Sequence, residues 1–378
     1  MPSIPSLSSS RRLAVASLLA TIACGPKGGT EAPDSGNGVT LPPEAKADAE
    51  TKADAETKAD TEAKADTEAK AEPAEPAGKV PEGSIALGTF NLEWAYDAIP
   101  DKRPSKAQPN VPKTDEVWEW KRNHIVDILA QERLDIVVLT ELGGEREISD
   151  IVTEITVKDG YDYRYAWVEG EDRLTGQQVA ILSRFPIDEE RRDEETSVGK
   201  HLAADIELPD GQMITVVAVH LKEGRFKGAV EARQREARSV QRFVRKLRRK
   251  HPVIIAGTFG SSSLPGDADY KESAPGTLAT KGCTDSASKS SARQTSVDGQ
   301  PVDRIIVCDM ELQDAQTAGR DRIVRGDVDP DEPWPTIPAD EGAQRDVSDH
   351  VVLWAQVAVP AKKEEGSGEG EADDEDGE

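Results

Sequence analysis

Apolar and polar positions divide the chain into a long middle region of regular elements and two flanking stretches without them. Between Gly83 and Pro360, short apolar runs bounded by turn residues alternate with amphipathic stretches. Strands are predicted over Ile85 to Leu92, Ile136 to Leu139, Gln178 to Leu182, Leu202 to Leu208, Met213 to Leu221, Pro252 to Phe259, Asp303 to Val307 and Val351 to Val357. Apolar spacing predicts helices over Val117 to Leu134 and Ala229 to Lys250. Strand pairs mixed with β-helix-β units predict a layered α/β domain with mixed sheets over residues 83–360, where roughly 280 residues are enough to bury a sizeable core.

The first 24 residues have the pattern of an export signal. Arg11 and Arg12 precede a short apolar run from Leu13 to Ala23, which is too short to span a bilayer comfortably. The run ends in Thr-Ile-Ala-Cys-Gly, which resembles the cleavage box of bacterial lipoproteins. That resemblance implies lipidation of Cys24, a membrane anchor and a place in the cell envelope, at the outer membrane or cell surface. Plain secretion with an unmodified Cys24 is the alternative.

Residues 25–82 and 361–378 lack the apolar residues that a core needs. In the first stretch a lysine recurs every six residues from Lys46 to Lys70, within units rich in Ala, Asp, Glu and Thr. Such a composition predicts a disordered tether that holds the domain off the membrane, with a specific binding repeat as the alternative. Residues 361–378 are rich in Glu, Asp and Gly and predict a disordered acidic tail.

The charge balance bears on the partners of the protein. A net charge of -25 should repel polyanions at long range, which argues against tight, unaided binding to nucleic acid. Basic residues are nevertheless concentrated between Lys222 and Lys250. This stretch is interpreted mainly as the solvated face of an amphipathic helix, and steering of a polyanion is the alternative.

Three cysteines are present, and one of them is Cys24. In an exported protein, the remaining pair, Cys283 and Cys308, is a disulfide candidate. Two small buried thiols are the alternative, and the spacing does not decide between them.

Polar residues stand directly after the apolar runs, where a sheet meets solvent. They are Asn91, Glu141, His220, the pair Thr258 and Gly260, Asp303, and the pair Asp349 and His350. Sites on open α/β sheets lie at strand ends of this kind. One polar strand end means little, whereas six in one domain indicate a site.

The order of these motifs resembles the endonuclease/exonuclease/phosphatase superfamily. The resemblance spans Ile85 to Val357, and its most specific pieces are Thr89-Phe90-Asn91, the segment at Glu141 and Ser348-Asp349-His350. It implies an α/β four-layer sandwich of two mixed β-sheets flanked by helices. The chemistry it implies is attack of water on a phosphoester, assisted by Mg²⁺ or Mn²⁺.

The resemblance also implies roles for individual residues on the metal side of the site. Glu141 matches the metal-binding glutamate, Asn91 the asparagine beside it, and Asp349 the late aspartate near the metal. A hard cation such as Mg²⁺ takes oxygen ligands and keeps several waters, so one or two carboxylates suffice. A cap of the following loop is the alternative role for Glu141.

On the catalytic side, His350 matches the histidine that contacts the scissile phosphate, and Asp303 the aspartate that orients it. An Asp-His pair fixes the ring tautomer and stabilises the imidazolium. His220 matches the other active-site histidine, a candidate for proton transfer or phosphate contact. The alternatives are a structural His220 and an ion pair between Asp303 and Arg304. If Arg304 faces the site, its guanidinium is suited to phosphate.

The chain departs from the family pattern at Thr258 and Gly260. The pattern there is Gly-Asp-Phe-Asn, in which Asp orients or activates water and Asn holds the phosphate. A threonine hydroxyl is no general base near neutral pH, and glycine has no side chain to donate. A carboxylate supplied by Asp267 or Asp269 is one route to rescue.

The sequence therefore predicts a metal-dependent phosphoester hydrolase, nuclease-like and monomeric, with nucleic acid as the leading substrate. Phospholipid and sugar-phosphate substrates rank behind it. A catalytically inactive, surface-anchored binding module of the same fold is the alternative, because the two departures remove groups that the chemistry uses.

Overall fold

The computed structural model describes residues 83–97, 112, 114–169, 175–192, 201–296, 298–319 and 347–359. The predicted signal peptide with Cys24, the tether and the acidic tail lie outside the described residues. Within the described ranges, no helix combines the length and apolar character needed to cross a bilayer.

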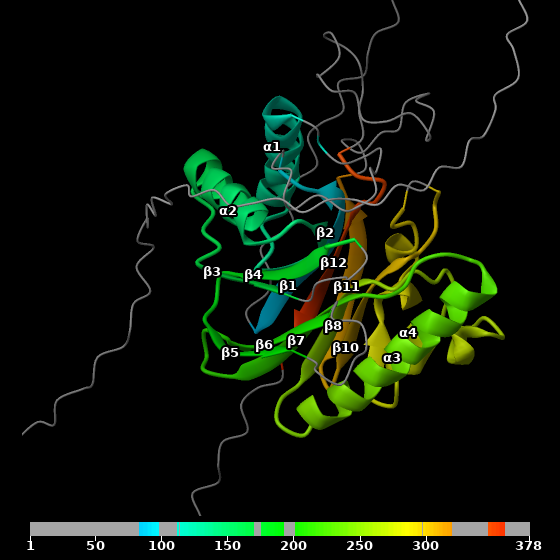
Figure 1. The fold of residues 1–378 in the computed structure, drawn as a ribbon. Helices are drawn as coiled ribbons and strands as arrows, with labels where there is room; N and C mark the ends of the chain where they lie inside the picture. The colour runs from blue at the N-terminus through cyan, green and yellow to red at the C-terminus, as the bar shows by residue number, and fades with distance from the viewer. Residues whose placement is uncertain are drawn as a thin grey trace, which may run out of the picture. The chain divides into compact units, whose positions relative to one another are not determined.

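Six strands form the first sheet, in the order β11-β12-β1-β2-β4-β3 (Figure 1). Their bounds are β1 Ser84–Ala95, β2 Ile136–Leu142, β3 Tyr165–Glu169, β4 Gln178–Ser183, β11 Glu311–Ala318 and β12 Val352–Ala358. Strands β1 and β2 are parallel and joined by a helix, whereas the other pairs are antiparallel. The sheet is therefore mixed, as predicted.

The second sheet repeats this plan in the order β5-β6-β7-β8-β10-β9. Its strands are β5 Ile187–Arg192, β6 His201–Glu207, β7 Met213–His220, β8 Val253–Thr258, β9 Cys283–Asp285 and β10 Asp303–Cys308. Strands β7 and β8 are the parallel pair. Gly257 is required in β8, because a Cβ there would lie 1.9 Å from the carbonyl oxygen of Val219 in β7. The close approach of the two backbones sets the position of the next residue, Thr258.

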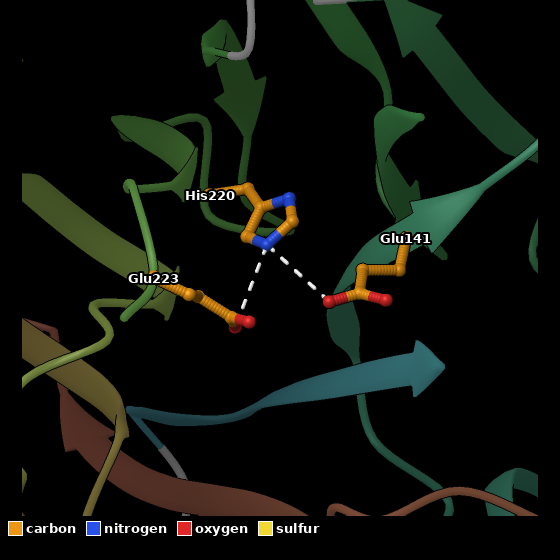
Figure 2. Close-up of side chains that lie close together, drawn as sticks. All are labelled: Glu141, His220 and Glu223. Atoms are coloured by element: carbon orange, nitrogen blue, oxygen red, sulfur yellow. Dashed lines mark ion pairs between the residues drawn. The ribbon is translucent and has the colours of Figure 1, made fainter. Parts of the chain in front are cut away.

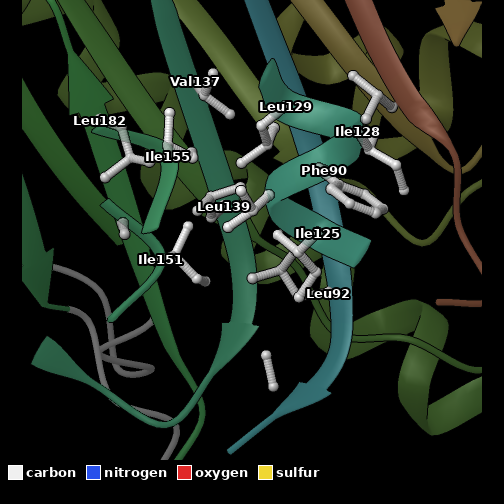
Figure 3. Close-up of a cluster of buried hydrophobic side chains, with 14 of the residues drawn as sticks. Phe90, Leu92, Ile125, Ile128, Leu129, Val137, Leu139, Ile151, Ile155 and Leu182 are labelled. Carbon is white, nitrogen blue, oxygen red and sulfur yellow. The ribbon is translucent and has the colours of Figure 1, made fainter. Parts of the chain in front are cut away.

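Helices cover the outer face of each sheet and complete four layers (Figure 1). They are α1 Asp115–Glu132, α2 Glu145–Asp159, α3 Lys227–Leu247 and α4 Ala274–Leu278, with short 3-10 turns η2 Tyr270–Glu272, η3 Ser286–Ser288 and η4 Ser290–Ala292. Figure 3 shows Ile125 and Leu129 of α1 and Ile151 of α2 packed on Phe90 and Leu139 of the first sheet. A separate apolar cluster fills the space between the sheets, and a third lies under α3 and α4. The predicted four-layer sandwich of two mixed sheets is confirmed.

Several elements were not predicted from the pattern, namely α2, α4, β3, β5, β9 and β11. Strand β11 alternates exposed and buried residues, and β3 has no fully buried residue, so neither shows the continuous apolar run that marks a central strand. Helix α2 does carry a helical signal, since Ile148, Ile151 and Ile155 are spaced by three and four residues. Edge strands and short helices of this kind are defined by their neighbours in the fold.

A disulfide joins Cys283 and Cys308. The two residues are directly opposite each other in the antiparallel pair β9–β10. The bond therefore fastens the short edge strand β9 to the sheet, and it decides the question that spacing had left open.

Candidate active site

The ends of five strands meet at one edge of the two sheets. Asn91 and Thr140 are paired in the first sheet. In the second sheet Thr258 lies beside both His220 and Asp303. The parallel pairs β1–β2 and β7–β8 bring their carboxyl ends to the same edge, which is why residues far apart in the sequence converge there.

Glu141 leaves the regular strand at the end of β2. Its φ of 62° is in the left-handed region, and the pairing register shifts between Thr140 and Leu142. Non-glycine residues held there are uncommon and cluster at functional sites. Its carboxylate is almost fully buried and accepts hydrogen bonds from Asn91 Nδ2 and Gln177 Nε2, both at 2.9 Å. Two amides therefore fix both carboxylate oxygens.

His220 lies between two carboxylates (Figure 2). Its Nε2 is 3.4 Å from Glu141 Oε1 and 3.7 Å from Glu223 Oε1. One ligand atom from each of the three residues can be chosen so that all lie within 4.8 Å of one another. Burial would raise the pKa of Glu223, but the hydrogen bond and positive charge of His220, together with the charge of His350, lower it below its ordinary value.

The loop that carries Glu223 is fixed by α3. Arg233 Nη1 donates to the carbonyl oxygens of Lys222 at 2.7 Å and of Gly224 at 3.0 Å. The Lys222 amide donates to Glu236 Oε2 at 2.6 Å. Two inward-facing side chains of the helix thus set the position of Glu223, although 48% of that side chain is exposed to solvent.

Asp303 and His350 form the second half of the site. His350 Nδ1 donates to Asp303 Oδ2 at 2.6 Å, and its Nε2 lies 3.5 Å from Asp349 Oδ1. Burial alone would lower the pKa of His350, but the carboxylates of Asp303 and Asp349 outweigh it and raise the pKa well above its ordinary value. Ser348 Oγ accepts from the His350 amide and donates to the Asn91 carbonyl, so this segment is anchored to the end of β1.

Thr258 is the centre of a hydrogen-bond network that joins the two sheets. Its hydroxyl donates to Asp303 Oδ1 at 2.8 Å and accepts from Asn91 Nδ2 at 3.2 Å. The Thr140 hydroxyl is also 3.2 Å away. The side chain is completely buried, so it positions Asn91 and Asp303 and has no access to substrate.

Gly260 opens onto a cavity of about 400 Å³ beside the site. The cavity is lined by Arg225, Arg233, Gly260, Ser262, Asp269 and Gln300, among others. The φ of Gly260 is 59°, and a Cβ there would approach the Lys222 carbonyl to 3.2 Å. A side chain at this position would therefore be crowded against the loop of Glu223.

The chain matches the Endonuclease/Exonuclease/phosphatase family over residues 88–350, which contain every site residue described above. The chain belongs to this family. No curated protein matches it.

Solved structures of the family share the fold at low identity. The endonuclease/exonuclease/phosphatase from Bacteroides vulgatus is 15% identical, with 73% of this chain and 99% of that chain covered and a TM-score of 0.50. The catalytic domain of human nocturnin is 14% identical, covers 74% and 96%, and has a TM-score of 0.49. D. rerio TDP2 complexed with a single-strand DNA product is 14% identical, with 73% of this chain and 99% of that chain covered and a TM-score of 0.47. The first of these matches supports the sandwich fold.

The residues present fit a divalent cation, which enzymes of this family use. The carboxylates of Glu141, Glu223, Asp303 and Asp349 converge on two histidines. Ligand atoms about 2.0–2.2 Å from one ion stand roughly 3–3.5 Å apart. The 3.4 Å between His220 Nε2 and Glu141 Oε1 agrees with that spacing, and the contact from His220 to Glu223 is slightly wider.

The structure brings together all of the sequence-predicted site residues of the folded domain. Asn91, Glu141 and His220 form one group, and Asp303, Asp349 and His350 form the other. No sequence pattern singled out Gln177, Glu223 or the buried Lys121, whose Nζ donates to the carbonyl oxygens of Glu93 and Val347. Glu223 alone had a usable signal, because it is a carboxylate three residues after a strand-end histidine.

Arg304 does not face the site, contrary to the phosphate-binding role considered for it. Its guanidinium is fully buried and lies 3.4 Å from Asp285, and it donates to the carbonyl oxygens of Ser263 and Asp303. Successive residues of a strand point to opposite faces, so placing Asp303 in the site turns Arg304 away from it. Asp303 accordingly pairs with His350 and not with the Arg304 side chain.

Asp267 and Asp269 do not replace the missing carboxylate at Thr258. Asp267 accepts from the Leu264 amide, and Asp269 accepts from the Ser263 hydroxyl. Both side chains therefore stabilise their own loop. The Thr258 hydroxyl bonds instead to Asn91 and Asp303.

Proposed function

We propose that this chain is a divalent-metal-dependent phosphodiesterase with nuclease-like activity. The observation that carries the proposal is the juxtaposition of Glu141, His220 and Glu223 with the pair Asp303 and His350. One group has the donors of a metal site, and the other has a buried histidine whose protonated form is stabilised by carboxylates. Both suit a centre that cleaves phosphoesters, and membership of the family supports a phosphoester hydrolase.

Glu141, His220 and Glu223 would hold the metal, with Asn91 and Gln177 fixing the Glu141 carboxylate. A bound divalent ion supplies Lewis acidity and lowers the pKa of water. An imidazole donor suits transition metals better than Mg²⁺, which prefers oxygen ligands alone. Of the two ions that the sequence resemblance implies, we therefore propose Mn²⁺ over Mg²⁺. Asp349, which lies beside His350, would contact the metal through water.

His350 would bind and stabilise the phosphate as charge builds on its oxygens. Asp303 holds the ring through Nδ1, and the raised pKa keeps the imidazole protonated near neutral pH. A fixed cation aimed at developing negative charge is among the largest contributions to catalysis. Thr258 supplies no base, so we expect turnover roughly 10²–10⁴-fold below that of a site with full acid-base help.

The substrate class we propose is nucleic acid, with phospholipid and sugar phosphates behind it. The family supports a phosphoester in general. The proposed location is the cell envelope, through lipidation of Cys24. The Cys283–Cys308 disulfide supports export, because such bonds persist in oxidising compartments.

Metal-dependent cleavage of bis(p-nitrophenyl) phosphate and of plasmid DNA tests the proposal. We expect turnover with Mn²⁺ that falls at least about 10²-fold in Glu141→Gln and His350→Ala. Glu311→Gln on an exposed strand and His251→Ala after α3 are matched controls that should keep full activity. Turnover that survives both site variants would mean that a contaminant or another site is responsible.

A catalytically inactive binding module is the second candidate, and the buried Thr258 hydroxyl favours it. That hydroxyl joins both sheets where the family places a water-activating carboxylate. In this case the native chain gives no turnover with Mn²⁺, while Thr258→Asp combined with Gly260→Asn gains it. Robust native turnover that Glu141→Gln abolishes would eliminate this candidate.

A further inference from the structure

The solvent-facing side of α3 carries an uninterrupted row of arginines. These residues, which we call the arginine row, are Arg235, Arg238, Arg242, Arg245 and Arg249. Their spacing alternates between three and four residues, which places the four within α3 on one face of the helix; Arg249 lies in the turn just after it, and all five are exposed. The stretch from Lys222 to Lys250 contains twelve basic residues and three acidic ones. The overall charge of the chain is -25, so this surface is a local exception.

The arginine row has no acidic partner among the described residues. The three acidic residues of the stretch are engaged elsewhere: Glu223 contacts His220, Glu231 pairs with Lys227, and Glu236 accepts from the Lys222 amide. Like charges at these spacings destabilise a helix by about 0.2–0.5 kcal/mol per pair. Packing does not require them, because the helix is held by its buried residues on the opposite face. The arrangement indicates an anionic partner.

A segment of the same chain has the matching charge. Residues 364–378 contain nine acidic residues and no basic residue. The acidic residues are Glu364, Glu365, Glu369, Glu371, Asp373, Asp374, Glu375, Asp376 and Glu378. The excess of nine positive charges between Lys222 and Lys250 equals this number.

The last strand of the fold ends beside the C-terminal end of α3. Strand β12 ends at Ala358, which is paired with Glu311 of β11. Two residues before Glu311, Asp309 forms an ion pair with Arg248, at 2.7 Å to Nε and 2.6 Å to Nη2. Arg248 caps α3 and adjoins Arg249, the last residue of the arginine row. The end of β12 and the end of the row therefore lie at the same edge of the domain.

The acidic segment is also long enough to cover the arginine row. Residues 359–363 reach at most about 17 Å when extended. The part of the arginine row within α3, from Arg235 to Arg245, extends about 15 Å, at 1.5 Å per residue. Residues 364–378 cover about 50 Å when extended, so they can follow the whole row.

We propose that residues 364–378 dock on the arginine row and shield it. A tethered segment competes at an effective concentration of about millimolar, which favours it over a free polyanion. The row begins at Arg235, eight residues after the first residue of α3, and ends just past the helix at Arg249. Docking therefore shields the basic surface over the middle and the C-terminal end of α3 at low ionic strength. This inference does not depend on catalytic activity.

Carbodiimide cross-linking of the full chain at 20 mM salt tests the proposal, because it joins carboxylates to nearby lysines. We expect peptides from residues 364–378 joined to Lys246 and Lys250 in the monomer. The triple variant Arg238→Gln, Arg242→Gln and Arg245→Gln removes no lysine and should lower these products at least 5-fold. A control variant with Arg164→Gln, Lys271→Gln and Lys289→Gln should leave them unchanged.

Two results would overturn docking. One is cross-linking spread evenly over the lysines of the domain, or unaffected by the triple variant. The other concerns a fluorescent single-stranded oligonucleotide, which we expect to bind at least 10-fold tighter at 50 mM salt when the nine acidic residues are changed to Gln or Asn. If the native chain and this variant bind the oligonucleotide with equal affinity, residues 364–378 do not compete for the arginine row.

Discussion

Thr258 has a structural role at the centre of the candidate site. The hydroxyl satisfies Asn91, lies against Thr140 and donates to Asp303. A carboxylate at the same place would have its oxygens next to Asp303 in a fully buried environment. The hydroxyl of Thr258 therefore avoids a like-charge contact with Asp303.

Thr258→Asp should accordingly lower the free energy of unfolding by about 3–5 kcal/mol without metal, because it buries an uncompensated charge. Saturating Mn²⁺ should recover most of the loss, since a ligand that binds only the native state stabilises it. Urea denaturation with and without Mn²⁺ measures both effects. Thr258→Ser retains the hydroxyl and serves as the control. A Thr258→Asp chain as stable as the native one without metal would show that this position tolerates a second carboxylate beside Asp303.

Glu223 is the second residue whose proposed role, as a metal ligand, depends on its immediate contacts, here the one with His220. We expect Glu223→Gln to lower the affinity for Mn²⁺ by roughly 10–100-fold, because an amide replaces a charged donor beside His220. Isothermal titration calorimetry gives the affinity without reference to turnover. Glu231→Gln, an exposed change on α3, is the matched control. If both variants bind Mn²⁺ as the native chain does, Glu223 is not a ligand.

At the scale of elements, α1 holds two distant parts of the site together through one lysine. Lys121 is fully buried, and its Nζ donates to the carbonyl oxygens of Glu93 and Val347, both at 2.8 Å. Glu93 belongs to the irregular end of β1, and Val347 precedes Ser348, Asp349 and His350. This buried charge ties the irregular end of β1 to the segment that carries His350.

Lys121→Met should lower the free energy of unfolding by about 2–4 kcal/mol, because two buried carbonyl groups lose their donor. The variant should also bind Mn²⁺ more weakly, since β1 carries Asn91. Lys158→Met on α2, where the lysine pairs with Asp127 at the surface, should change stability by less than about 0.5 kcal/mol. Equal losses in the free energy of unfolding for the two variants would show that the buried hydrogen bonds of Lys121 contribute no more than a surface ion pair.

At the scale of the whole molecule, the sequence predicted the layers well and the contacts within the site in part. Central strands such as β2 are continuous apolar runs, and strand-end residues such as Glu141 and Asp303 fall at one edge once the parallel pairs form. Gln177 and Lys121 were missed because their partners Glu141 and Val347 lie 36 and 226 residues away. Glu223 was missed because its position depends on the loop that follows His220. The face on which Arg304 lies was left open by the sequence, because strand alternation and not residue type sets it.

The stability of the domain at high pH depends on two buried tyrosines, Tyr161 and Tyr163. The hydroxyl of Tyr161 donates to the carbonyl oxygens of Arg133 at 2.6 Å and Leu134 at 3.0 Å. Burial raises the pKa of Tyr161 to about 12, against the opposing charge of Arg184. The pKa of neighbouring Tyr163 is also raised, chiefly by burial. Both groups therefore remain neutral in the folded domain at a pH where they ionise in the unfolded chain.

Because the pKa values of Tyr161 and Tyr163 are raised in the folded domain, its stability falls as the pH rises. Stability from a raised pKa is complete below the unfolded value near 10 and is lost as the pH rises toward 12. We expect urea midpoints to fall between pH 9 and 11.5, and to fall less steeply in Tyr161→Phe. That variant should also be less stable at pH 8 by about 1 kcal/mol, because it loses the hydroxyl donor. Tyr165→Phe, at the exposed end of β3, is the control and should follow the native curve. Parallel curves for Tyr161→Phe and the native chain would show that Tyr161 does not govern alkaline unfolding.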